Sequence, residues 1–193
     1  HEAAEMAPIT PFLAYAPAGA EAHFADLVTP GTQLVLADGE AIAEPGIAGI
    51  GRGLFQATRS LFRSGYGAIS LVSADAPTLP VVTLAEAAHR LARPGERMVL
   101  GPAADGGYYL IGLKALYPRL FEEISWSSET VAEETVARAR EIGLEVVLLH
   151  SWYDVDDEAT LGRLCSALDR DAEQAPATKA ALARLGLIGA VME

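Results

Sequence analysis

Residues 101–112 read Gly101-Pro102-Ala103-Ala104-Asp105-Gly106-Gly107-Tyr108-Tyr109-Leu110-Ile111-Gly112, and this stretch decides how the chain is expected to fold. Apolar residues lead into it and apolar and aromatic residues leave it, so it predicts strand, tight turn, strand. Two glycines after Asp105 suit a turn that needs positive φ or a close approach to a ligand. A plain β-hairpin turn is the simpler alternative, because Asp-Gly is a strong hairpin signal. The irregular backbone already begins at Gly101-Pro102, which favours a site.

Three further predicted strand ends are acidic or polar. They read Ser73-Ala74-Asp75-Ala76-Pro77, Ser125-Trp126-Ser127-Ser128-Glu129 and Trp152-Tyr153-Asp154-Val155-Asp156-Asp157. In an open α/β sheet such ends converge on the crevice where ligands bind. The sequence therefore predicts a carboxylate-lined site suited to a metal ion and a phosphorylated substrate.

Strand and helix patterns alternate along the whole chain. Strands are expected at residues 9–15, 33–37, 68–72, 97–100, 108–113 and 144–149, and helices at 20–28, 52–63, 80–91, 129–142, 157–168 and 178–187. The apolar run 68–72 has the pattern of a parallel strand buried on both faces. This alternation predicts a layered α/β fold, and no linker divides residues 1–193 into separate domains.

Composition narrows the function classes. The chain has 193 residues, 51% of them hydrophobic, and a net charge of −12, which disfavours binding to nucleic acid. Phosphorylated small molecules remain compatible, because a cation held by carboxylates reverses the local sign. No apolar stretch is long enough to span a bilayer, and no basic leader is visible, so we expect a soluble cytoplasmic protein without a membrane partner. A homodimer is compatible with the sequence, which does not decide the oligomeric state.

Two acidic segments are candidate metal ligands. Asp75 ends a predicted strand, and Ser73 two residues earlier favours a site over a simple helix cap. If Asp154 and Asp156 are extended, both side chains point to one face, where a cation would relieve their repulsion. The alternative is that the acids are solvated capping residues; Asp157 itself suits the N-cap of the next helix.

Other candidates surround these acids. One of the two tyrosines at 108 and 109 is expected to line a pocket and the other to pack inward. Trp126 is a candidate wall of an acceptor pocket, whereas Ser127 or Ser128 is expected to cap the following helix. The glycine-rich segment 49–53 is a weak phosphate-loop candidate with Arg52 near a phosphate.

The motifs at residues 73–80, 101–112, 126–131 and 154–157, in this order, resemble those of the DUF2064 family, also called MobA-like or selenodomain-associated transferases. The resemblance runs from about Phe12 to Leu168. It implies a nucleotide-diphospho-sugar transferase (GT-A) fold, a three-layer α/β sandwich with a mostly parallel sheet. It also implies a transferase that moves a sugar from a nucleotide sugar to a small acceptor.

The resemblance suggests roles for the candidate residues. Asp75, Asp154 and Asp156 would bind a divalent cation, Mg²⁺ or Mn²⁺, and Asp105 would act beside Asp75 in catalysis by orienting a hydroxyl. The substrate-binding set would be Ser73, Gly106, Gly107, Tyr108, Trp126 and Ser127. Two alternatives stay open. One is a nucleotidyltransferase of the MobA or phospholactate guanylyltransferase kind, and the other is a non-catalytic member that binds nucleotides or other ligands.

One departure from the family stands out. The family opens with a strand and a Lys-Pro-x-x-Gly-x-x-Lys-Thr-Arg-Leu type of loop that grips the nucleotide diphosphate, whereas this chain opens with His1-Glu2-Ala3-Ala4-Glu5-Met6. Residues 1–193 are therefore expected to be a single GT-A-like domain without that strand and loop. Either the chain is a fragment or this member has lost ordinary nucleotide binding.

Overall fold

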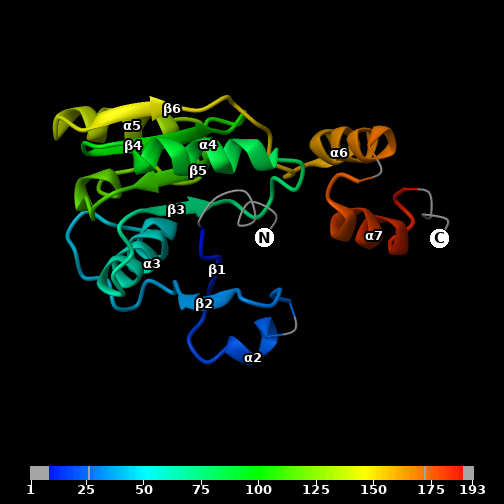
Figure 1. Cartoon of the computed structure of the whole chain (residues 1–193), viewed down its shortest axis with the longest axis horizontal. Coiled ribbons are helices and arrows are strands. Elements are labelled where there is room, and N and C mark those ends of the chain that lie inside the picture. Colours follow the sequence, from blue (N-terminus) through cyan, green and yellow to red (C-terminus); the bar gives the residue numbers. More distant parts are fainter. Residues whose placement is uncertain (1–8, 26, 172, 189–193) are drawn as a thin grey trace.

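A central four-stranded sheet organises the computed structural model, which describes residues 9–25, 27–171 and 173–188. The elements, in chain order, are β1 (Phe12–Tyr15), α2 (Glu21–Phe24), β2 (Gln33–Leu36), α3 (Ile50–Arg63), β3 (Ile69–Val72), α4 (Val81–Ala92), β4 (Arg97–Pro102), β5 (Tyr108–Leu113), η1 (Pro118–Leu120), α5 (Val131–Glu141), β6 (Glu145–Leu148), α6 (Glu158–Arg170) and α7 (Pro176–Arg184). The alternation of strands and helices confirms the predicted α/β fold (Figure 1). The opening residues compared with the family loop lie outside the described ranges.

The strand order of the sheet is β3-β5-β4-β6, and β1 and β2 form a separate parallel pair. β4 pairs in parallel with β6, and β5 runs antiparallel to both β3 and β4. Three of the four strands therefore run in the same direction. Their carboxyl ends meet at one edge of the sheet, where the polar segments were expected to converge.

Helices cover both faces of this sheet and give three layers. On one face, Ala87 and Leu91 of α4 pack on Val99 and Leu110. On the other face, Phe55 of α3 belongs to the larger core cluster. The remaining buried members of that cluster include Met98, Leu100, Ile111, Leu113, Phe121 and Ala139. The strand residues alternate between the two clusters as the pleat of a strand requires.

The last two helices pack mainly on each other. Leu164 and Leu168 of α6 and Leu182 of α7 form a third cluster, and the pair lies at one end of the molecule (Figure 1). Within the described part of the chain, no helix is long and apolar enough to cross a membrane.

Several element boundaries differ from the sequence prediction for local reasons. The helix expected over 20–28 shrinks to α2, four residues long. α5 begins at Val131 with Thr130 as its N-cap, so neither serine caps it as expected, and Ser127 has a left-handed φ of 63°. α7 begins at Pro176, two residues before the predicted start, because proline fits the first helical turn.

Candidate functional site

A cleft of about 810 Å³ lies where the polar strand ends meet. It is lined by residues from the ends of β3 and β5, the β4–β5 turn, the segment before α5, the start of α3 and the segment before α6. These residues are Ile50, Leu54, Leu71, Val72, Ser73, Ala74, Asp75, Asp105, Gly107, Tyr108, Tyr109, Trp126, Ser127, Ser128, Glu129, Val131, Asp154 and Asp156. The structure thus brings every candidate catalytic, metal-binding and substrate-binding residue except Gly106 to one cleft, whereas Arg52 lies outside it.

The β4–β5 turn presents Asp105 to the cleft. The backbone N–H of Gly107 donates to Oδ1 of Asp105 at 2.8 Å, and the N–H of Ala103 donates to the Gly107 carbonyl at 2.9 Å. Both bonds hold the acidic side chain at the turn. Asp105 is exposed, so its second oxygen stays accessible to a ligand.

Gly106 has a packing role that the sequence did not reveal. Its φ is 96°, and a Cβ there would lie 2.0 Å from the carbonyl oxygen of Glu129. Its own carbonyl accepts the N–H of Ala132 at 2.9 Å. Gly106 therefore ties the turn to the start of α5, and Gly107 is the glycine that faces the cleft.

A register shift at Gly101/Pro102 affects the pairing of the two tyrosines: Tyr108 is paired with Pro102, and Tyr109 has no partner in the β4–β5 register. Tyr109 lies over Gly101, where a Cβ would approach its ring to 2.3 Å, and its hydroxyl donates to the carbonyl of His150 at 2.8 Å. The hydroxyl of Tyr108 is buried, without a partner among the described residues, and burial raises its pKa. Tyr109 is the fully buried ring of the two, although both contribute to the lining of the cleft.

The end of β3 is joined to the acidic segment before α6. The backbone N–H of Ser73 donates to the backbone carbonyl of Tyr109 at 2.9 Å, and the Ser73 hydroxyl donates to the Asp75 carboxylate. The carbonyl of Asp75 accepts the N–H of Val155 at 2.9 Å. Because Val155 stands between Asp154 and Asp156, this bond fixes both acids beside the strand end.

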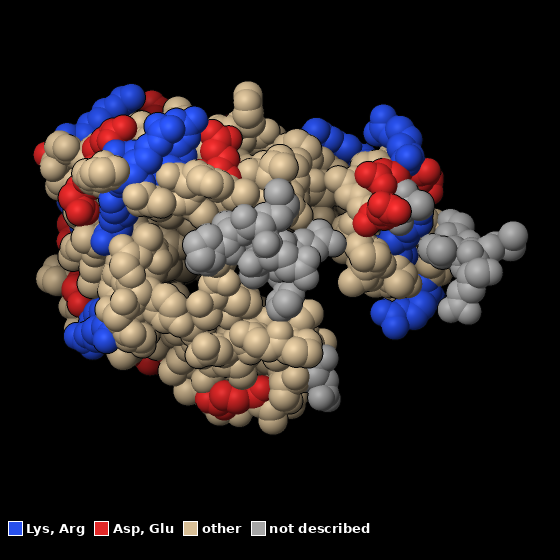
Figure 2. All heavy atoms as spheres, in the orientation of Figure 1, with Lys and Arg blue, Asp and Glu red and all other residues tan. Residues whose placement is uncertain are grey.

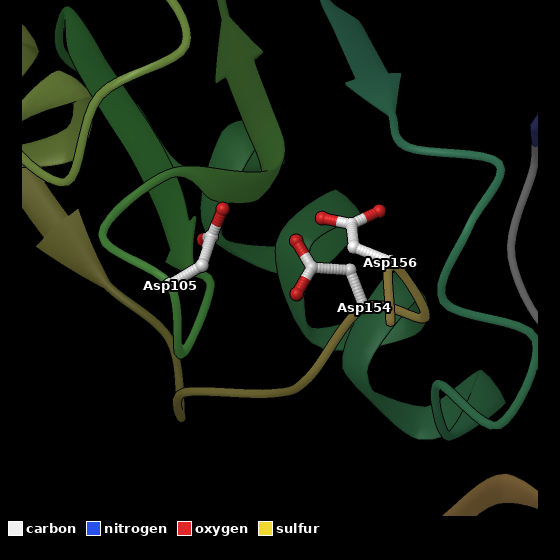
Figure 3. Close-up of side chains that lie close together, drawn as sticks. All are labelled: Asp105, Asp154 and Asp156. Atoms are coloured by element: carbon white, nitrogen blue, oxygen red, sulfur yellow. The ribbon is translucent and has the colours of Figure 1, made fainter. Parts of the chain in front are cut away.

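Three carboxylates converge in the cleft. Asp105, Asp154 and Asp156 offer oxygens that all lie within 4.8 Å of one another, and Figure 3 shows Asp154 between the other two. Burial, followed by the charges of Asp105, Asp156 and Asp75, raises the pKa of Asp154, against the lowering effect of a backbone hydrogen bond. The raised pKa reflects burial first and the neighbouring carboxylates second, and a bound cation would favour the charged form of Asp154.

The observed group differs from the predicted metal set in one member. Asp105 from the β4–β5 turn joins Asp154 and Asp156, whereas Asp75 lies in the same cleft outside this close group. Asp157 is the N-cap of α6 as expected, since it accepts the N–H of Thr160 at 2.7 Å in a capping box. That bond lowers the pKa of Asp157, so this acid serves the helix and not the cleft.

Trp126 forms an aromatic wall against the start of α3. A Cβ at Gly51 would lie 2.6 Å from its ring, and Gly49 also faces it. The indole N–H is buried without a partner among the described residues. Arg52, expected near a phosphate, donates to the carbonyl of Ile42 at 2.8 Å and does not line the cleft.

The charge of the cleft is one-sided. Five of its lining residues carry carboxylates, namely Asp75, Asp105, Glu129, Asp154 and Asp156, and none of the lining residues within the described ranges is a lysine or arginine. Sequence reasoning missed Ile50 and Leu54 as lining residues, and it placed Glu129 in a segment near the crevice without assigning it to the site. Their places depend on how α3 and the start of α5 pack, which no local pattern encodes.

Comparison with known proteins defines the class of this fold. A crystal structure from Desulfovibrio desulfuricans G20, provisionally assigned as a nucleotide-diphospho-sugar transferase, superposes with a TM-score of 0.73 at 25% identity. The match covers 92% of this chain and 76% of that one, so the chain has the nucleotide-diphospho-sugar transferase fold.

The sequence gives the family as well. Residues 1–128 match the model of DUF2064, described as an uncharacterized protein conserved in bacteria, and the chain belongs to this family. No protein among the curated proteins matches the sequence.

Proposed function

We propose that the chain is a divalent-cation-dependent glycosyltransferase that moves a sugar from a nucleotide sugar to a small acceptor. The observation that carries this proposal is the acidic cleft at the strand ends, together with the fold shared with a provisional nucleotide-diphospho-sugar transferase. The Asp105, Asp154 and Asp156 group is the part of the cleft best suited to a cation.

The geometry fits Mg²⁺ or Mn²⁺. Oxygens on opposite sides of a bound Mg²⁺ are about 4.2 Å apart, twice the usual metal–oxygen distance. Adjacent oxygens around such an ion are about 3 Å apart, so the three carboxylate oxygens, now within 4.8 Å of one another, would draw together by side-chain rotation. When bound, the cation would supply positive charge for the diphosphate leaving group. The lining residues offer no cationic side chain for that task within the described chain.

The other lining residues would hold the two substrates. The backbone at Gly107 would lie against the donor, and Ser73 would keep Asp75 oriented toward it through their hydrogen bond. We assign Asp105 the further task of orienting a hydroxyl, because it belongs to the acidic group and is also exposed to the open cleft. Tyr108, Trp126 and Ser127 would form the wall that receives the acceptor.

One observation favours a second candidate, a binding protein without turnover. A cleft without a lysine or arginine on its described walls lacks a direct partner for a diphosphate. Such a protein would bind a cation or a neutral ligand and release no product. Nucleotidyl transfer uses the same cleft and is distinguished from sugar transfer by its product, pyrophosphate.

Product analysis tests the proposal. The chain is incubated with Mn²⁺, a panel of nucleotide sugars and nucleoside triphosphates, and mixed small acceptors, and the released nucleotides are separated by chromatography. We expect a nucleoside diphosphate from one nucleotide sugar. Asp156→Asn should abolish its release, and Asp169→Asn, which removes an exposed acid of α6, should not. Pyrophosphate release would replace sugar transfer by nucleotidyl transfer, and no product from any donor would favour the binding protein.

A further inference from the structure

A second, smaller cleft of about 200 Å³ lies beside α6. One side consists of residues that follow β3 and β6, the other of residues from one face of α6, and Gln174 before α7 completes the lining. The first two sets are Thr78, Trp152 and Tyr153, and Arg163, Ala167 and Arg170. The side-chain amide of Gln174 donates to the Thr78 carbonyl at 3.2 Å. None of these residues is used by the proposed transferase site.

The aromatic side of this cleft is held by a chain of hydrogen bonds. The indole N–H of Trp152 donates to the buried hydroxyl of Thr78 at 3.3 Å, and that hydroxyl donates to the Tyr153 hydroxyl at 2.9 Å. The two rings stack with centroids 5.9 Å apart. The wall is therefore preorganised for a ligand instead of having to form around it.

The α6 side carries two arginines and a small residue between them. Positions 163, 167 and 170 share one face of a helix, and the two arginines are about 10 Å apart along its axis. The Arg163 guanidinium lies 3.7 Å from the centre of the Tyr153 ring. The Nε–H of Arg170 donates to the backbone carbonyl of Ser166 at 3.0 Å. Ala167 leaves the space between them open.

Neither guanidinium is paired with a carboxylate among the described residues, whereas Arg59, Arg90, Arg97, Arg119 and Arg138 all are. Other described arginines are also without a carboxylate partner, so what distinguishes Arg163 and Arg170 is that both line one cleft. Figure 2 shows Lys and Arg side chains at the α6–α7 end of the visible face, with Asp and Glu side chains among them. A guanidinium stacked on a ring keeps its N–H groups in the plane, free for an oxyanion.

We propose that this second cleft binds a small organic oxyanion, a phosphate or a carboxylate, between Arg163 and Arg170 and against the Trp152 and Tyr153 rings. Guanidinium groups match both oxyanions through paired N–H donors. The volume is below the roughly 300 Å³ of the smaller drug-sized pockets, which excludes a nucleotide sugar here. The site stands independently of the proposed transferase activity.

The test uses the full chain in EDTA, so that no cation draws an anion to the first cleft. Inorganic phosphate and succinate are titrated separately by calorimetry. We expect saturable binding of at least one of them, and the one that binds identifies the oxyanion. Arg163→Gln/Arg170→Gln should weaken that binding by about tenfold or more. Arg63→Gln/Arg184→Gln removes two exposed arginines elsewhere and should change it by less than about twofold.

Two further variants locate the site. Trp126→Phe leaves Trp152 as the one tryptophan of a chain that has two, so its fluorescence should follow the titration. Ala167→Leu fills the cleft with both arginines intact and should weaken binding as strongly as the double variant. The proposal is overturned if neither phosphate nor succinate saturates the protein at millimolar concentration. It is also overturned if the two double-arginine variants weaken binding equally.

Discussion

The two clefts are built on the same two chain segments but carry opposite charge. Asp75 faces the first cleft and Thr78, three residues later, faces the second; Asp154 faces the first, and Trp152 and Tyr153 just before it face the second. Among the described lining residues the first has carboxylates without a cationic side chain, and the second has guanidiniums without a carboxylate. The first cleft would therefore attract a cation directly, whereas the second would attract an anion without one.

The clefts also differ in what holds them. The first is fixed by backbone contacts, above all the hydrogen bonds from Val155 to Asp75 and from Ala132 to Gly106. The second depends on side-chain contacts around Thr78. Substitutions that remove one kind of contact should therefore damage the two clefts unequally.

Gly106→Ala should have the largest effect, and it should fall on the first cleft. The new Cβ would meet the Glu129 backbone at 2.0 Å at a left-handed φ, which we expect to cost about 3 kcal/mol or more in the free energy of unfolding. Gly107→Ala is the matched control, because its nearest contact is the Asp105 side chain at 3.2 Å. It should cost about 1 kcal/mol or less. Urea denaturation measures both, and equal costs would contradict the account.

Thr78→Val should loosen the second cleft. The buried hydroxyl is lost with both of its hydrogen bonds, and the Trp152 N–H is left without its partner. We expect a loss of about 1–3 kcal/mol in urea denaturation. Thr83→Val, on α4, serves as the control substitution. If oxyanion binding survives Thr78→Val at full strength, the hydrogen-bonded wall is not part of that site.

Asp154→Asn should separate stability from cation binding in the first cleft. Its carboxylate is crowded by Asp105, Asp156 and Asp75, so the amide should leave the cation-free protein as stable as before or slightly more stable. Mn²⁺ binding, measured by electron paramagnetic resonance, should weaken by about tenfold or more. A destabilised protein with unchanged Mn²⁺ affinity would reverse the assignment of Asp154.

Asp157→Ala should have the smallest effect on the two clefts. Its effect on the pH dependence of stability should be opposite to that of Asp154→Asn. The Thr160 contacts lower the pKa of Asp157 below its ordinary 3.8, so its stabilisation is complete above that value and is lost as the pH falls through the lower folded pKa. The variant should therefore lose less stability on acidification than the parent.

Asp154 has a raised pKa, so its destabilising effect is present at neutral pH and is relieved as the pH falls through that raised value. Asp154→Asn should make the acid-side loss of stability steeper. Thermal unfolding between pH 7 and pH 3 measures both variants. If the two slopes change in the same sense, the acids do not have the separate roles assigned to them.

Sequence reasoning succeeded where the signal is local. The turn at Asp105-Gly106-Gly107, the cap at Asp157 and the convergence of strand ends all follow from short-range patterns and the geometry of α/β sheets. Trp126 beside the cleft was also predicted, since its segment precedes a helix at the same edge of the sheet.

Side-chain direction and long-range packing were not readable. A strand end locates Asp75 within a few ångströms, but the choice of Asp105 as the third member of the acidic group depends on the angle of the turn. The contact of Gly106 with Glu129 joins residues whose approach is set by α5. The second cleft depends on how α6 places Arg163 over Tyr153, and no pattern in either segment indicates that contact.

The central claim is that the acidic cleft accepts a nucleotide diphosphate only together with a cation. Calorimetric titration of nucleoside diphosphates and nucleotide sugars, with Mg²⁺, with Mn²⁺ and in EDTA, tests it most directly. The account predicts binding of one nucleotide series in the presence of a cation and none in EDTA. Equal binding in EDTA, or no binding of any nucleotide by the folded, cation-loaded chain, would contradict it.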